Sequence, residues 1–222
     1  MDMARRIAVV KEEARTDWTG KRGKQGAFLM ARPVRRLEEA LLGRSSAALL
    51  KRVFSILKGD MVVLDVGCGS GYLSLPIARK LDSGRVICVD LSEEMLAGLA
   101  RRARAAAVSD RIQVIRTAVD TTGLADAAVE VVVSNNLLHE LHDPVAAVTE
   151  WERVLKPGGH MALSDFRTTR LTNLLMSHEH GEEANDPFDV EGLRTLLQEA
   201  GLENVEVTPY RNKLLALADK PA

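Results

Sequence analysis

Short apolar runs alternate with amphipathic stretches through most of this 222-residue chain. The runs predict strands, and the first of them, residues 61–66, is apolar on both faces except for Asp65 and so predicts a buried strand. Spacings of three and four between apolar residues predict helices. The expected strands are residues 61–66, 85–90, 112–116, 129–134 and 160–165, and the expected helices are 72–81, 93–107, 144–155 and 190–200. This alternation is typical of an α/β domain built on a parallel sheet.

The end of the chain has a different pattern. After the last helix, two strands are expected at Val205–Thr208 and Leu214–Ala218, joined by the short connection Pro209–Asn212. A connection of this length favours a hairpin, which would add an antiparallel strand to the sheet.

Charge separates the N-terminal segment from the rest. Residues 1–58 hold 14 Lys and Arg against 6 Asp and Glu, whereas residues 59–222 hold 16 against 25, so that the net charge is −1. Helices are expected at 3–15, 34–42 and 45–57, with a glycine-rich loop at 17–26. We expect residues 1–58 to be a helical cap or lid and residues 59–222 to be the main domain, with a solvated tail as the alternative.

A glycine turn follows the first strand. Gly67, Gly69 and Gly71 stand at alternate positions between the strand that ends near Val66 and the next helix. Glycines let the backbone approach a ligand closely, and the free N–H groups at a helix start supply donors. Asp90 ends the next strand, where a carboxylate can accept hydrogen bonds from both ribose hydroxyls of an adenosine.

The residues around this turn separate two cofactor classes. Dinucleotide sites carry G-x-G-x-x-G, and here Tyr72 stands where that pattern requires its third glycine. A carboxylate at Asp65 would repel a pyrophosphate but would hold an α-amino group, directly or through water. Both features disfavour a nicotinamide dinucleotide.

The segment Asp65–Gly71 resembles the acid-x-Gly-x-Gly-x-Gly motif of the class I S-adenosylmethionine-dependent methyltransferases. Residues 90–96, 129–141 and 151–159 extend the resemblance in the same order along the chain. It implies a three-layer Rossmann-like methyltransferase fold, whose seven-stranded sheet is mostly parallel with an antiparallel C-terminal hairpin strand. It also implies S-adenosyl-L-methionine as the cofactor.

The resemblance assigns the cofactor site residue by residue. The expected cofactor-binding residues are Asp65, Gly67, Cys68, Gly69, Gly71, Asp90, Leu91, Met95, Ala118, Val119 and Asn135. One departure concerns adenine, because Ala118 stands where the family often has the acid that meets the adenine amino group. Adenine recognition would then depend on the backbone of Ala118 and Val119, or on Asp120.

Histidines are the candidate proton acceptors. We expect His139, after the fourth strand, to be the catalytic base, because a neutral imidazole can take a proton from the acceptor near physiological pH. The alternative is that His139 only packs over the cofactor or caps a short helix, and His142 is expected at the surface. No metal site is expected, since His139, His142, His178 and His180 match no zinc spacing.

The predicted function is methyl transfer from S-adenosylmethionine to a small molecule, in a protein that resembles the branch with ubiquinone and menaquinone biosynthesis enzymes. The alternatives are a non-catalytic S-adenosylmethionine-binding or S-adenosylhomocysteine-binding module, an RNA methyltransferase and an NAD-dependent dehydrogenase. A nucleic-acid acceptor is disfavoured, because residues 134–137 lack the Asn/Asp-Pro-Pro-aromatic motif of base methyltransferases and aromatics are only 4% of the chain. Neither the acceptor atom nor the oligomeric state follows from the sequence.

Hydropathy and cysteine content suggest the compartment. The chain has no apolar run near the roughly 18 residues that a membrane span needs, and its N-terminus is charged. Cys68 and Cys88 form no metal-type spacing and are expected to be reduced and structural. These features predict a cytoplasmic protein.

Overall fold

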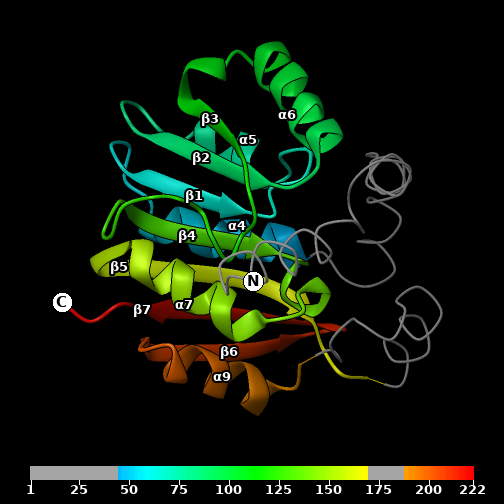
Figure 1. Cartoon of the computed structure of the whole chain (residues 1–222), viewed down its shortest axis with the longest axis vertical. Helices are drawn as coiled ribbons and strands as arrows, with labels where there is room; N and C mark the ends of the chain where they lie inside the picture. The colour runs from blue at the N-terminus through cyan, green and yellow to red at the C-terminus, as the bar shows by residue number, and fades with distance from the viewer. Residues whose placement is uncertain (1–44, 170–187) are drawn as a thin grey trace, which may run out of the picture.

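The computed structural model describes residues 45–169 and 188–222. Seven strands form one sheet in the order β3-β2-β1-β4-β5-β7-β6 (Figure 1). All neighbouring pairs are parallel except those that involve β7, which runs antiparallel to β5 and to β6. The strands are β1 (Val62–Val66), β2 (Arg85–Asp90), β3 (Ile112–Arg116), β4 (Val129–Asn135), β5 (Leu155–Phe166), β6 (Glu203–Tyr210) and β7 (Lys213–Asp219). The predicted sheet, with its C-terminal hairpin, is therefore confirmed.

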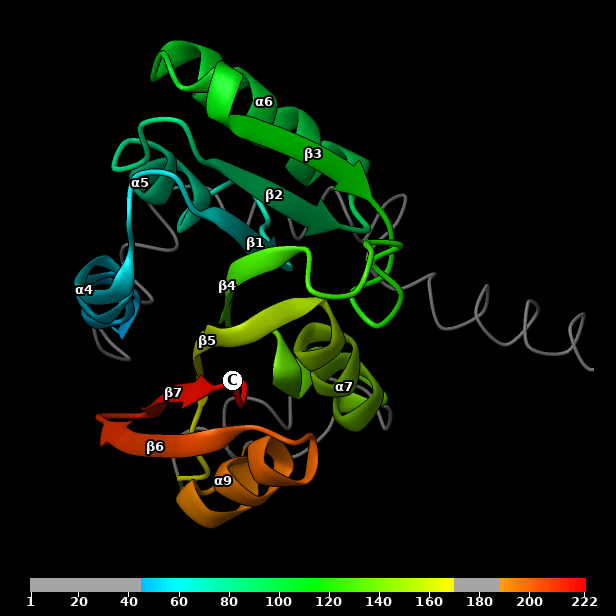
Figure 2. The same ribbon diagram turned by 90° about the vertical axis from the view of Figure 1, so that its left-hand side faces the viewer.

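Helices cover both faces of the sheet and form the two outer layers of a three-layer fold (Figure 2). One face packs against α4 (Ser45–Ile56), α5 (Ser74–Ala78) and α6 (Glu93–Ala105), and the other packs against α7 (Pro144–Val154) and α9 (Val190–Glu199). Two short 3-10 helices, η1 (Ser109–Arg111) and η2 (Leu138–Glu140), lie in connections. Alternate residues of each central strand enter opposite cores, which explains the continuous apolar runs in the sequence.

Most predicted elements form within two residues of the predicted bounds, but two differ more. The helix predicted for residues 72–81 is shorter, because residues 71–73 continue the turn and α5 spans Ser74–Ala78. The fifth strand begins earlier than predicted, at Leu155, because Leu155 pairs with Val129 before the register shifts. This pairing brings the Lys-Pro-Gly-Gly segment, typical of a turn, into the strand.

Side-chain caps fix where the helices beside the strand ends begin. The Ser92 hydroxyl accepts the Met95 amide at 3.3 Å, and the Asp143 carboxylate accepts the Ala146 amide at 2.9 Å. Each cap satisfies an amide that has no partner within its helix. As a result, α6 and α7 both start next to the carboxyl ends of the strands.

The structure describes the predicted N-terminal segment only from Ser45 onward. Leu49 and Val53 of α4 are fully buried in the same core as β1 and β4, so this helix is part of one layer of the fold. The helices predicted for 3–15 and 34–42 and the loop at 17–26 lie outside the described residues. The domain division at residue 58 therefore stays a prediction. Within the described ranges, no helix is both long and apolar enough to cross a membrane.

Candidate cofactor and active site

A cavity of about 330 Å³ opens at the carboxyl ends of β1, β2 and β4. In open α/β sheets this edge is where ligands bind. Four chain segments and one residue of α7 supply its wall. The lining residues are Asp65, Gly67–Tyr72 without Gly71, Leu73, Asp90–Ser92, Met95, Ala118–Thr121, Asn135–Leu137, Glu140–Asp143 and Ala147.

The glycine turn forms the floor of this cavity, and its glycines have different roles. All three have positive φ angles, +63° at Gly67, +50° at Gly69 and +86° at Gly71. A Cβ on Gly69 would meet no atom within 4 Å, so this backbone faces open space, as a ligand cradle requires. A Cβ on Gly71 would lie 2.2 Å from a methyl carbon of the buried Leu99, and Gly71 does not line the cavity.

Asp90 ties the end of β2 to the turn. Its two carboxylate oxygens accept the amides of Gly69 and Ser92, each at 2.8 Å. Burial raises the pKa of Asp90 above its ordinary value, although these backbone hydrogen bonds oppose the rise. A carboxylate oxygen can accept more than one hydrogen bond, so Asp90 can still receive ribose hydroxyls from the cavity.

Two further polar groups face the same space. Asp65 is 2% exposed, lines the cavity and accepts a hydrogen bond from the Ser74 hydroxyl. Asn135, at the end of β4, accepts the Ser46 hydroxyl at 3.4 Å through its side-chain oxygen. Its side-chain nitrogen is buried and has no partner among the described residues. Such an unsatisfied donor at a cavity wall fits a bound ligand.

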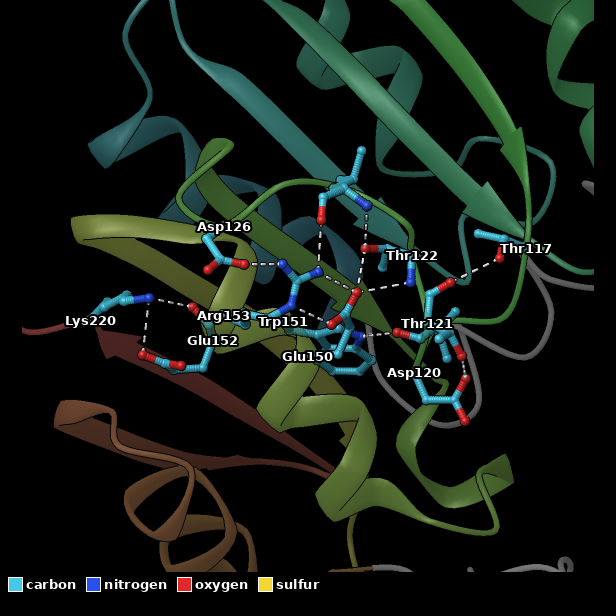
Figure 3. Close-up of polar contacts among 12 residues, drawn as sticks. Thr117, Asp120, Thr121, Thr122, Asp126, Glu150, Trp151, Glu152, Arg153 and Lys220 are labelled. Atoms are coloured by element: carbon cyan, nitrogen blue, oxygen red, sulfur yellow. Dashed lines mark hydrogen bonds and ion pairs between the residues drawn. The ribbon is translucent and has the colours of Figure 1, made fainter. Parts of the chain in front are cut away.

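The turn that follows β3 supplies another part of the cavity wall. Ala118, Val119 and Asp120 line the cavity there, and the indole N–H of Trp151 donates to the Val119 carbonyl at 2.8 Å (Figure 3). With Asp90 between this turn and the glycines, the cavity offers places for a purine, a ribose and an amino group.

Comparison with known proteins identifies the family of the segment that forms this cavity. Residues 64–163 match the family described as "Methyltransferase domain". This segment is a class I S-adenosylmethionine-dependent methyltransferase domain. The family implies S-adenosyl-L-methionine as the cofactor, which confirms the prediction, and the nicotinamide alternative loses its support.

Two relatives and one solved structure show how far the likeness to the methyltransferases extends. An uncharacterized methyltransferase of Mycobacterium tuberculosis is 34% identical over 115 residues, which are 52% of this chain and 55% of the relative. The 27-O-demethylrifamycin SV methyltransferase of Amycolatopsis mediterranei is 32% identical over 132 residues, 58% of this chain and 48% of the relative. The chain thus spans about half the length of these relatives.

The solved structure is that of the [4+2]-cyclase SpnF. It superposes with a TM-score of 0.67 over 81% of this chain and 80% of the cyclase, at 20% identity. This likeness concerns the fold alone, because one framework can carry different reactions.

The methyltransferase cavity brings together nearly all the residues that the sequence assigned to the cofactor. Ten of the eleven line it, and Gly71 is the exception. The assignment of each residue to the cofactor stays a prediction. The sequence reasoning named Glu140 among the candidate polar groups near the methyl group, and the structure places it at the cavity wall. It missed several other lining residues, of which Asp143 carries charge. His142 is exposed, as expected, but it also stands at the cavity wall.

His139 precedes the lining residue Glu140 but does not itself line the methyltransferase cavity. It is 2% exposed, its Nδ1 is 2.6 Å from an Asp165 oxygen, and its Nε2 is 3.6 Å from Glu140. Burial alone would lower the pKa of His139, but the charge and hydrogen bond of Asp165 outweigh burial and raise it. The raised pKa favours the protonated imidazole, whereas a general base must start neutral. The base role of His139 stays a prediction.

Asp165 organises the segment that follows β4. One of its oxygens accepts the amides of Leu137 at 3.0 Å and Leu138 at 2.7 Å, and the other accepts the Phe166 amide at 2.6 Å. Burial would raise the pKa of Asp165, but His139 and other charged or hydrogen-bonding neighbours lower it. The carboxylate is therefore ionised, and it anchors η2 next to the cavity.

Lys213 of β7 is the least expected member of this region. It is 2% exposed, its ammonium donates to the Asn136 side-chain oxygen at 2.8 Å, and it lies 2.9 Å from the centre of the Phe166 ring. A lysine at the start of an apolar strand was the available signal, since buried lysines are rare without partners. His178 and His180 lie outside the described residues. Elsewhere, the described part of the chain contains no group of three potential metal ligands.

Proposed function

We propose that this protein transfers the methyl group of S-adenosylmethionine to a small-molecule acceptor by direct displacement. The proposal rests on one observation above all: the Asp90 carboxylate is held by the Gly69 amide at the rim of a turn whose backbone faces an open cavity. That geometry suits a ribose held beside the glycine turn. Bound S-adenosylmethionine would supply an electrophilic methyl group on a positively charged sulfur.

The protein's part in this reaction is binding and alignment. In the proposal, Asp65 holds the α-amino group, Asp90 holds the ribose, and the turn at Ala118 and Val119 receives the adenine. The Asn135 amide, which has an unused donor, orients the amino-acid portion or the acceptor. Because displacement at a methyl carbon needs an in-line approach, these contacts act by fixing direction and distance.

A small acceptor is favoured by one relative. The cavity of about 330 Å³ is within the range of small-molecule sites, about 300 to 1,000 Å³, and the proposed cofactor would occupy it. The relative from Amycolatopsis carries the name of a rifamycin methyltransferase, and a rifamycin is a small molecule. The more specific prediction of a place beside the ubiquinone and menaquinone enzymes stays a prediction.

The base role predicted for His139 is better filled, in this proposal, by a residue that lines the cavity. Glu140 does so, and His139 stands 3.6 Å from its carboxylate. We therefore assign His139 a positioning role that orients Glu140 and η2. With a known acceptor, His139→Gln should then lower turnover with little change in cofactor affinity, and so should Glu140→Gln.

Calorimetric titration with S-adenosylmethionine, S-adenosylhomocysteine and NAD in parallel tests the proposal. We expect binding of both S-adenosyl ligands and none of NAD. Asp90→Asn should lower the affinity for S-adenosylhomocysteine by about 10- to 100-fold, because it removes one or two charge-assisted hydrogen bonds. Asp110→Asn is the matched control, because Asp110 is an exposed aspartate in η1, outside the cavity wall.

Three outcomes contradict the proposal in different ways. Binding of NAD alone would mean that the glycine turn serves another cofactor. Equal affinity in the wild type and Asp90→Asn would remove the site assignment. Tight binding of both S-adenosyl ligands without methyl transfer to any member of a broad acceptor panel would favour the non-catalytic binding module.

A further inference from the structure

The turn after β3 presents backbone groups to the cavity at the place where the family often has an acid. The Thr121 amide donates to the Ala118 carbonyl at 3.3 Å, and the Thr117 hydroxyl donates to the Thr121 carbonyl at 2.9 Å. Val119 and Asp120 are the central residues of this turn, and both line the cavity. No hydrogen bond within the described part of the chain uses either of their amides. Two donors are thus available at the wall where adenine is expected.

Helix α7 holds this turn through side chains that point toward it (Figure 3). Trp151 is fully buried, and its indole N–H donates to the Val119 carbonyl at 2.8 Å. One Glu150 oxygen accepts the Thr122 amide at 2.9 Å and the Thr122 hydroxyl at 2.6 Å. Arg153 donates both to Glu150 and, at 2.8 Å, to the Leu124 carbonyl. The turn and the connection after it are therefore fixed at several points.

Glu150 remains ionised in this network. Burial would raise the pKa of its carboxyl, but the hydrogen bonds from Arg153 and Thr122 lower it overall. Asp126 pairs with the same guanidinium from the other side. Glu150 and Arg153 thus hold the connection after the turn, at Thr122 and Leu124, whereas the Trp151 hydrogen bond holds the turn itself.

The Trp151 hydrogen bond also sets the direction of an amide. The described peptide bonds contain no cis bond, and in a trans peptide the carbonyl and the following N–H point in opposite directions. Because the Val119 carbonyl is directed at Trp151, the Asp120 N–H is directed away from the indole. Rotation of this peptide would break the hydrogen bond to the buried indole.

We propose that Trp151 is a positioning residue for adenine recognition: it fixes the Val119–Asp120 peptide so that the Asp120 N–H donates to N1 of the purine. The inference rests on the proposed cofactor. N1 of adenine accepts a hydrogen bond, whereas N1 of hypoxanthine carries a hydrogen and would oppose the amide. The fixed peptide therefore selects an adenine cofactor over a 6-oxopurine one, without a carboxylate at Ala118.

The test compares S-adenosylhomocysteine with S-inosylhomocysteine, its 6-oxo counterpart, by calorimetry. The wild type should prefer the adenine ligand by at least tenfold. Trp151→Phe keeps a buried ring but removes the N–H, and it should reduce this preference at least fivefold. Val154→Ala is the control, because Val154 is a fully buried residue of the same helix and core, and among the described residues it makes no hydrogen bond to the turn. If the role of Trp151 is merely structural, Trp151→Phe should lower the affinity for both ligands by the same factor and leave the preference unchanged.

A measurement on the wild type keeps the inference testable if Trp151→Phe does not fold. The S-nucleosidylhomocysteine of unsubstituted purine keeps N1 as an acceptor but lacks the 6-amino group. Its affinity should lie within threefold of that of S-adenosylhomocysteine. An affinity more than tenfold lower would show that the site recognises the 6-amino group instead of N1, and would overturn the inference. If the wild type binds none of these ligands, the proposed function fails. If it binds the adenine and hypoxanthine ligands equally, only this inference fails.

Discussion

Replacing two glycines of the same turn by alanine should have opposite effects on stability and binding. At Gly71, the added Cβ would lie 2.2 Å from Cδ1 of Leu99 and 3.3 Å from Leu75. Leu99 is fully buried in the core, so it has little room to move. At Gly69, the added Cβ meets no protein atom within 4 Å and would project into open space at the cavity.

The expected magnitudes follow from these contacts. A left-handed backbone costs an alanine about 1–2 kcal/mol, and overpacking of a filled core costs about 1–3 kcal/mol. Gly71→Ala should therefore lower the free energy of unfolding by about 2–5 kcal/mol, and Gly69→Ala by only about 1–2 kcal/mol. The affinity for S-adenosylhomocysteine should fall by about tenfold or more in Gly69→Ala, because the new methyl group occupies the ligand's place.

Urea denaturation followed by circular dichroism measures the first quantity, and calorimetric titration of the folded protein measures the second. Gly71→Ala, wherever it remains folded, should bind S-adenosylhomocysteine within about threefold of the wild type. The reasoning is refuted if both variants lose equal stability, or if Gly69→Ala binds as tightly as the wild type. The first result would mean that the Leu99 side chain moves to make room for the new methyl group. The second would mean that the ligand does not approach Gly69.

Two further predictions concern charge and packing. The raised pKa of His139 stabilises the fold below the ordinary histidine pKa of about 6.5, and this contribution is lost as pH rises through the higher folded-state value. The free energy of unfolding should therefore decline from pH 6 to pH 9 more steeply in the wild type than in His139→Gln, as urea denaturation at each pH would show; parallel profiles would contradict the pairing with Asp165. Leu49→Ala should lower the free energy of unfolding by about 2–5 kcal/mol, because Leu49 is fully buried between α4 and the sheet. A loss below about 0.5 kcal/mol in thermal or urea denaturation would mean that α4 is not part of the folded core.

Local patterns in the sequence were enough to predict the sheet and the cofactor edge. Strands buried on both faces give continuous apolar runs, so β2 occurs at the predicted residues. The parallel arrangement of β1, β2 and β4 then places their carboxyl ends at one edge, which is why Asp65, Asp90 and Asn135 could be grouped from the sequence. The C-terminal hairpin could be predicted for a similar reason, since its connection is too short for a parallel crossover.

Contacts between distant segments could not be predicted in this way. The three glycines look equivalent in the sequence, yet only packing against Leu99 separates Gly71 from the two that face the cavity. Likewise, only the structure shows that His139 is buried with its Nδ1 2.6 Å from an Asp165 oxygen.

The sequence by itself determined the order of strands and helices, the glycine turn and the acids at the strand ends, because each depends on residues near one another in the chain. Only the tertiary structure decided which side chains have shifted pKa values, which are buried and which face the cavity. Trp151 illustrates the difference, since it stands 32 residues from the Val119 carbonyl that it holds. Protonation, burial and orientation depend on neighbours brought together by folding, and the spacing of residues along the chain carries no record of those neighbours.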